Sequence, residues 1–150
     1  MRIPVGAPDA VAWVRGEGDT SGPLGVVKFY QMRDGTWVTA DVSGLPDTET
    51  NFFAFHIHEG GDCGGSAFSD TGGHYNPEKT AHPNHAGDLP PLLAHNGRAS
   101  MAVLTGRFRV PDILGRTVVI HHDPDDFHTQ PAGNSGVKIA CGVIRPAEPM

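Results

Sequence analysis

The sequence has few basic residues and no long hydrophobic segment. Its 11 lysines and arginines are outnumbered by 17 acidic residues, which gives a net charge of -6, and they form no basic cluster. Nucleic-acid binding needs such a cluster to neutralise phosphates, so we expect no nucleic acid partner. No apolar run approaches the roughly 20 residues that span a bilayer, so we expect no membrane partner. Residues 1–8 lack the features of a signal peptide, which favours a cytoplasmic protein and leaves an exported form open.

Cysteine is also scarce. The only two are Cys63 and Cys141, separated by 78 positions. This separation excludes a CxxC redox pair and a zinc knuckle. The two residues could form one long-range disulfide or remain buried thiols, and spacing alone favours neither.

Glycine and proline are abundant instead and are spread along the whole chain. The 20 glycines and 13 prolines separate short runs of β-branched and aromatic residues, as turns that join strands do. Because 150 residues fit one domain, we expect a single all-β domain over residues 1–150. Strands are predicted over residues 10–15, 25–32, 36–42, 51–58, 99–110, 116–121 and 137–144.

Residues 59–91 show almost no apolar periodicity. A compact domain rarely contains a structureless loop of this length unless something holds it in place. The loop offers three imidazoles and one carboxylate, a set that suits tetrahedral zinc, from His74, His82, His85 and Asp88. A polar surface loop without metal is the alternative, but nothing would then hold it.

Three more histidines lie on predicted strands. His56 and His58 alternate with apolar residues, so both imidazoles face the same side of the strand and can reach one ion. Two solvent-facing side chains are the alternative for such a pair taken alone. His121 ends another strand and shares its face with Val119, which makes a third strand-borne imidazole available.

Five ordered motifs give the chain a resemblance to the copper/zinc superoxide dismutase family over roughly residues 10–145. They are residues 55–58, 72–77, 85–89, 115–121, and 133–136 leading into 140–144. The resemblance implies an eight-stranded Greek-key β-barrel or sandwich, immunoglobulin-like, with long metal-binding loops. It also implies an antioxidant oxidoreductase, a superoxide dismutase that converts superoxide to dioxygen and hydrogen peroxide at a redox-cycling copper bridged to zinc by His74.

The same resemblance implies the ligands of both cofactors, copper and zinc. It assigns copper to His56, His58, His74 and His121, and zinc to His74, His82, His85 and Asp88. His74 would bridge the metals and act in catalysis. Asp125 would link His56 to His82 and fix the orientation of both rings. Cys63 and Cys141 match the intrachain disulfide of the family.

Lys138 departs from the family pattern. It stands on the last predicted strand, where members usually carry an arginine, and it keeps the positive charge but lacks the planar fork that positions a small anion. We therefore expect Lys138 to act in catalysis by attracting superoxide, with activity below that of a typical member. A solvated lysine at a strand edge is the alternative. Ala132 stands where many members of the family have a threonine that narrows the channel to copper, which predicts a wider channel here.

Other functions also fit parts of the sequence. A non-catalytic copper-binding or copper-delivery module could use the same fold, although the intact ligand set argues against it. A β-sandwich held together by zinc alone would bind copper weakly and would not disproportionate superoxide. We expect a monomer or a homodimer, because Arg145 and Pro146 interrupt the apolar contact through which members of the family commonly dimerise.

Overall fold

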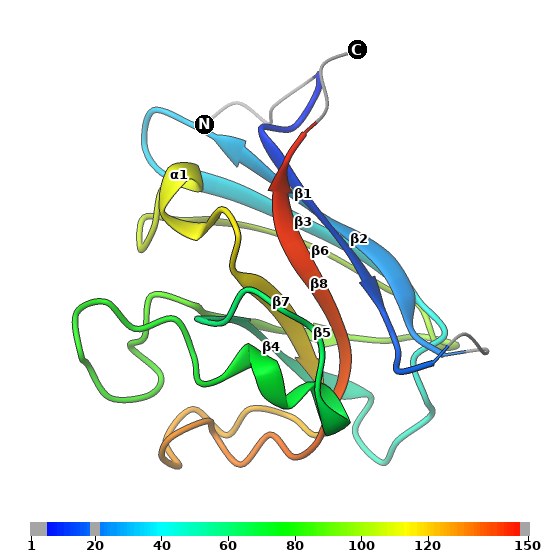
Figure 1. The fold of residues 1–150 in the computed structure, drawn as a ribbon. Coiled ribbons are helices and arrows are strands. Elements are labelled where there is room, and N and C mark those ends of the chain that lie inside the picture. The colour runs from blue at the N-terminus through cyan, green and yellow to red at the C-terminus, as the bar shows by residue number, and fades with distance from the viewer. Residues whose placement is uncertain (1–5, 19–21, 148–150) are drawn as a thin grey trace.

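A computed structural model describes residues 6–18 and 22–147, and within these ranges the chain is almost entirely antiparallel β-structure (Figure 1). Its strands are β1 (Ala10–Arg15), β2 (Leu24–Gln31), β3 (Thr36–Ser43), β4 (Phe52–His58), β5 (Asp88–Leu93), β6 (Ala99–Thr105), β7 (Thr117–His121) and β8 (Lys138–Pro146). Two short helical segments accompany them, the 3₁₀ segment η1 (Ser66–Thr71) and α1 (Val110–Ile113). In the described ranges neither segment has the length and apolar character that a membrane-crossing helix needs.

The strands form one sheet in the order β5-β4-β7-β8-β1-β2-β3-β6, which curls into a nearly closed barrel (Figure 1). Strands β5 and β6 are the two ends of this order, and they approach each other across a seam. Three successive pairs of strands are not neighbours in this order: β3 and β4, β6 and β7, and also β5 and β6, which face each other across the seam. This is a Greek-key arrangement, so the predicted all-β, eight-stranded fold is confirmed.

One predicted strand ends several residues too late, and one strand is missing from the prediction. The pattern extends a strand to residue 110, but β6 ends at Thr105 and the short helix α1 begins at Val110. The proline in the first turn suits a helix start, since its missing N–H would be unpaired there, and the Asp112 carboxylate accepts a hydrogen bond from the Arg109 N–H at 2.9 Å. Residues 88–93 form β5, although the predicted loop extends to residue 91.

The two faces of β4 have different roles. Phe53, Phe55 and Ile57 are fully buried inside the barrel, where each contributes about 1.5–3 kcal/mol relative to an exposed position. His56 and His58 face the other way and are nevertheless 0% and 2% exposed. The predicted alternation is therefore confirmed, and the two imidazoles are buried outside the apolar core.

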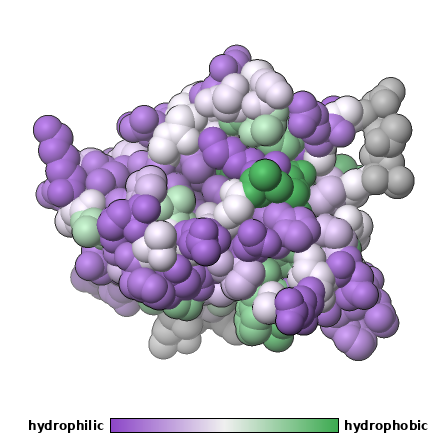
Figure 2. Space-filling view, turned by 90° about the horizontal axis from the view of Figure 1, so that it is seen from below, coloured by the Kyte–Doolittle hydropathy of each residue, from purple (hydrophilic) through white to green (hydrophobic). Residues whose placement is uncertain are grey.

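Two long loops cover this outer face, the histidine loop (residues 59–87) and the entrance loop (residues 122–137). They lie side by side at the lower end of the barrel in Figure 1. The histidine loop is tied to β4 by the backbone hydrogen bonds of Ile57 N to Gly87 O and of Tyr75 N to Ile57 O, both 2.8 Å. Figure 2 looks onto this end of the molecule and shows a mostly hydrophilic surface.

A disulfide between Cys63 and Cys141 attaches the start of the histidine loop to β8. The bond packs against Phe68 and Val119, which form a small apolar cluster outside the barrel interior. The disulfide implied by the family resemblance is therefore present. The disulfide therefore fixes the start of the histidine loop, whereas His82 and His85 lie near its other end.

Candidate metal centre

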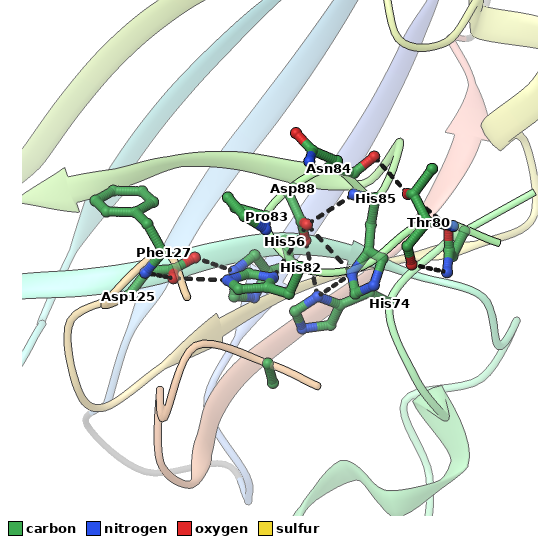
Figure 3. Close-up of polar contacts among 12 residues, drawn as sticks. His56, His74, Thr80, His82, Pro83, Asn84, His85, Asp88, Asp125 and Phe127 are labelled. Atoms are coloured by element: carbon green, nitrogen blue, oxygen red, sulfur yellow. Dashed lines mark hydrogen bonds and ion pairs between the residues drawn. The ribbon is translucent and has the colours of Figure 1, made fainter. Parts of the chain in front are cut away.

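Six buried histidines converge on the outer face of β4. Two come from β4 itself, one ends β7, and three come from the histidine loop: His56, His58, His121, His74, His82 and His85. The His74 ring lies at the centre, with its centroid 4.0 Å from that of His56, 4.8 Å from that of His58 and 5.2 Å from that of His85. Figure 3 shows His74 among its loop neighbours, next to Asp88 at the start of β5.

Two overlapping sets of side chains have the spacing of metal ligands. In each set, one ligand atom from every residue lies within 4.8 Å of the others: His56, His58, His74 and His121 in the first, and His56, His74, His82 and Asp88 in the second. His85 is outside the second set, but its Nδ1 lies 3.2 Å from both His74 Nδ1 and Asp88 Oδ2. The structure thus brings all seven predicted ligands together.

Backbone carbonyls fix the tautomers of His58 and His121. Nδ1 of His58 donates to the Gly72 carbonyl at 2.8 Å, and Nδ1 of His121 donates to the Gly136 carbonyl at 3.3 Å. A neutral imidazole carries one N–H, so Nε2 of each ring has a lone pair. These two Nε2 atoms lie only 3.3 Å apart. Facing lone pairs repel each other, and a cation bound between them would remove the repulsion.

Asp125 fixes the tautomers of two further rings (Figure 3). Its carboxylate accepts hydrogen bonds from His56 Nε2 at 2.8 Å and from His82 Nε2 at 2.7 Å, and all three side chains are at most 1% exposed. Nδ1 of each ring therefore carries a lone pair, and neither finds a hydrogen-bond partner in the described part of the chain. Gly133 borders this bridge so closely that a Cβ atom there would collide with Asp125 Oδ1 and His82 Nε2.

Asp88 gathers the three histidines of the loop. His74 Nδ1 lies 2.8 Å from its Oδ1, while His82 Nδ1 and His85 Nδ1 lie 3.0 and 3.2 Å from its Oδ2. Since His82 Nδ1 has no proton, it repels the carboxylate oxygen unless a cation sits near both. Tetrahedral zinc at about 2.0–2.1 Å from each ligand separates the ligand atoms by about 3.3 Å. The donor set and its spacing therefore fit zinc.

His74 is shared between the two groups. Its Nδ1 faces Asp88 and His85, whereas its Nε2 is buried and, among the residues the structure describes, has no hydrogen-bond partner. This nitrogen is on the side of the ring that belongs to the first set. Both ring nitrogens of His74 are thus placed to contact a cation, one on each side.

The protonation of the site follows from its burial. Burial lowers the pKa of His56 to about 4, that of His121 to about 3 and that of His58 to about 2. For Asp88 and Asp125 burial acts in the opposite direction, but hydrogen bonds from the histidines outweigh it and hold the pKa of both carboxyls below the usual range. Neutral imidazoles and ionised carboxylates are the forms that bind metals. His56, His58, His121 and Asp88 are therefore in the form that binds metals at neutral pH.

A pocket of about 400 Å³ opens the first group of histidines to solvent. Its lining includes His58, His74, His121, Ala132 and Lys138. A larger cavity of about 620 Å³ lies on the outer face of β1 and β8, but it contains none of the clustered histidines. The smaller pocket therefore gives a solute access to His58, His74 and His121 of the first ligand group.

Lys138 is anchored at the wall of this pocket. Its Nζ donates to Thr71 Oγ1 at 2.6 Å and to the Gly72 carbonyl at 3.2 Å. The Gly72 carbonyl is the group that also accepts from His58 Nδ1, so the ammonium lies next to one of the candidate ligands. Burial lowers the pKa of Lys138 from its ordinary value.

The family model of copper/zinc superoxide dismutase matches residues 24–144, which is most of the chain. The chain belongs to the copper/zinc superoxide dismutase family. Among its relatives are "Superoxide dismutase [Cu-Zn] 3" of Arabidopsis thaliana, 38% identical over 96% of this chain and 94% of that protein, and "Superoxide dismutase [Cu-Zn] 2" of Aquifex aeolicus, 36% identical over 81% and 79%. "Superoxide dismutase [Cu-Zn]" of Legionella pneumophila is 36% identical over 84% and 83%. The family predicted from the five motifs is confirmed, and copper and zinc are the metals that fit the two ligand groups.

The sequence of this dismutase family member did not reveal the backbone groups that orient its histidines. The carbonyls of Gly72 and Gly136 orient His58 and His121, and the hydroxyl of Thr71 holds Lys138. The direction of a backbone carbonyl in a long loop cannot be predicted from the residue types. The glycines themselves are the one available signal, because Gly72 and Gly136 both have positive φ, where other residues are strained.

Proposed function

We propose that residues 1–150 form a single copper/zinc superoxide dismutase domain that converts superoxide to dioxygen and hydrogen peroxide. The observation that carries the proposal is the pair of overlapping ligand groups, which have His56 and His74 in common. His56 has only Nδ1 left to bind a metal, because Asp125 holds its Nε2, whereas His74 presents one ring nitrogen to each side of the cluster. This arrangement suits a paired metal centre bridged by His74 better than two unrelated ions.

In this proposal copper would be held by His56, His58, His74 and His121, and zinc by His74, His82, His85 and Asp88. When bound, copper would supply one-electron redox chemistry at imidazole nitrogens, and zinc, which has no redox chemistry, would order the loop and polarise His74. The lone pairs on His56 Nδ1 and His82 Nδ1 have no hydrogen-bond partner among the described residues, and they support the two assignments because a bound cation would satisfy them. Asp125 would hold one ligand of each metal in the required tautomer.

His74 would deliver a proton to the product. Hydrogen peroxide carries two protons that superoxide lacks, so the site needs a proton donor beside the reacting oxygen. His74 lines the pocket, and its buried Nε2 faces the copper side without a hydrogen-bond partner among the described residues. With Nδ1 facing Asp88 and His85 on the zinc side, the ring can accept a proton at Nε2 and release it to a departing anion.

Lys138 would attract the substrate. Superoxide is an anion and the protein carries a net charge of -6, so capture needs a local positive charge at the pocket. The anchored Lys138 ammonium meets this need at the pocket wall. Because an ammonium cannot form the two parallel hydrogen bonds of a guanidinium, we propose that turnover is slower than in a member with arginine there.

A copper-delivery module is the second candidate, and ligand burial argues against it. Handing over a metal requires a partner to reach the ligands, whereas His56 and His58 are 0% and 2% exposed beneath two loops. A pocket of about 400 Å³ suits the entry of a small anion better than the approach of another protein. The dismutase is therefore the function the geometry supports best.

The deciding experiment is superoxide disproportionation by protein loaded with one copper and one zinc per chain. We expect activity that is lost in His58→Ala, raised in Lys138→Arg and unchanged in His95→Ala, a control at an exposed histidine outside both ligand groups. Activity no better than free copper, despite stoichiometric binding, would favour the copper-binding module. Tight zinc binding with weak copper binding would favour a zinc-held sandwich. The expected assembly is a monomer or a homodimer, which sedimentation velocity distinguishes.

A further inference from the structure

The segment of the histidine loop that carries two zinc ligands has no regular secondary structure. His82 and His85 lie at its ends, and residues 82–85 belong to neither a strand nor a helix. In contrast, His56, His58 and His121 stand on β4 and β7, whose paired backbones hold them in register. The zinc side therefore needs another means of fixing its ligands.

Gln130 of the entrance loop holds the backbone of His82 at two points. Its Oε1 accepts a hydrogen bond from His82 N at 2.9 Å, and its Nε2 donates to His82 O at 2.8 Å. The same Nε2 donates to His128 O at 3.1 Å within the entrance loop. One amide side chain thus pairs with His82 as a neighbouring strand would, while Asp125 of the same loop binds the His82 ring.

Arg107 holds the other end of the segment and belongs to neither of the two long loops. It lies between β6 and α1, and its Nη1 donates to Pro83 O at 2.7 Å and to His85 O at 3.1 Å. Hydrogen bonds from a charged donor are stronger than those between neutral groups. In Figure 3, Pro83 and His85 lie on the side of the cluster next to Asp88.

We propose that Gln130 and Arg107 are positioning residues, which preorganise the backbone of residues 82–85 so that His82 and His85 are presented to zinc. The inference rests on the proposed zinc site. Gln130 and Arg107 make four hydrogen bonds to the backbone of the segment, three to its carbonyls and one from its first N–H. Without them, zinc binding would have to order a less constrained loop and would be weaker by that cost.

The test compares zinc affinity in single variants by competition with a chromophoric chelator. Gln130→Ala and Arg107→Ala should each weaken zinc binding by about 10–100-fold, the range for partners that orient ligands. Gln130→Glu should also weaken zinc binding, because it keeps the acceptor for His82 N but loses the hydrogen bonds donated to His82 O and His128 O. Arg107→Lys should recover most of the affinity, since an ammonium can donate to the same two carbonyls. Arg33→Ala removes an exposed arginine elsewhere and should change nothing.

Two further readouts separate positioning from general destabilisation. Copper affinity should change little in all variants, because the ligands on β4 and β7 do not depend on the clamped segment. Cobalt placed in the zinc site should show a weaker tetrahedral absorption band in the alanine variants than in the Arg33→Ala control. If the alanine variants bound zinc with the affinity of the Arg33→Ala control, the proposal would be overturned. An equal loss of copper affinity and zinc affinity in these variants would overturn it as well. A wild-type protein that binds zinc but dismutes no superoxide would sink the proposed function while leaving this comparison valid.

Discussion

Substitution of Asp125 probes the link between the two metal sites. Asp125→Ala removes the hydrogen bonds from His56 at 2.8 Å and from His82 at 2.7 Å, both at rings with 0% side-chain exposure. Each buried N–H left without an acceptor costs about 1–3 kcal/mol, so the free energy of unfolding should fall by about 2–6 kcal/mol. Both rings would also be free to change tautomer. We therefore expect copper and zinc affinities to fall together, each by about 10–100-fold.

Asp125→Asn makes a sharper prediction from the same geometry. An amide has one acceptor oxygen and one donor nitrogen, so it can accept from only one of the two rings. The other ring must turn its lone pair toward the amide, which places its proton on Nδ1, where the metal would bind. The affinity for one metal should therefore fall much more than the affinity for the other.

The assay is chelator competition for each metal, accompanied by thermal unfolding of the same samples. Asp41→Ala, at an exposed carboxylate that lies 3.4 Å from Arg98, is the matched control. If Asp125→Ala bound both metals with the affinity of the control, the carboxylate would not orient the rings and the reasoning would be refuted.

Three other predictions follow from the disulfide, the buried histidines and Lys138. Replacing both cysteines, Cys63→Ser with Cys141→Ala, opens a loop of 78 residues and should lower the guanidinium-derived free energy of unfolding by about 4.5 kcal/mol; a loss below about 1 kcal/mol would contradict this. For the metal-free protein, His56, His58 and His121 have a folded pKa below the usual 6.5, so only the unfolded chain gains protons as pH falls below about 6.5. The melting temperature should therefore drop between pH 7 and 5, and a flat profile would argue against neutral buried rings. Because burial lowers the pKa of Lys138, kcat/KM should fall as alkaline pH rises and the ammonium loses its proton. Lys138→Arg should extend activity to higher pH. Coincident pH profiles of kcat/KM for the wild type and Lys138→Arg would show that Lys138 does not guide the substrate.

The strands were predictable wherever apolar alternation was uninterrupted. Residues 10–15 and β1 coincide, and most other strands differ from their predicted ranges by one or two residues. Strand β5 was missed because Pro90 and Pro91 stand in it, and proline usually argues against a strand. Its position at an end of the sheet removes that objection, but the strand order that reveals it is not readable from local sequence.

The candidate ligands were predictable for a different reason. The choice of His, Asp and their spacing is set by the metals, so His56, His58 and the loop histidines stand out against an otherwise ordinary composition. The groups that hold those ligands follow from tertiary folding. Nothing local marks Gln130 as a partner of His82, 48 positions away, or Arg107 as a partner of Pro83, and only the folded loops bring them together.

The prolines of β5 also protect one end of the sheet against unwanted self-association. An edge strand offers N–H and C=O groups with which a strand of another molecule can pair, and such pairing begins many fibrils. Neighbouring residues of a strand direct their N–H positions to opposite sides, so one of Pro90 and Pro91 removes a donor from the open side of β5 and an incoming strand would meet a gap there. If the protein aggregates through strand addition after losing its metals, growth should therefore begin at β6, on the other side of the seam.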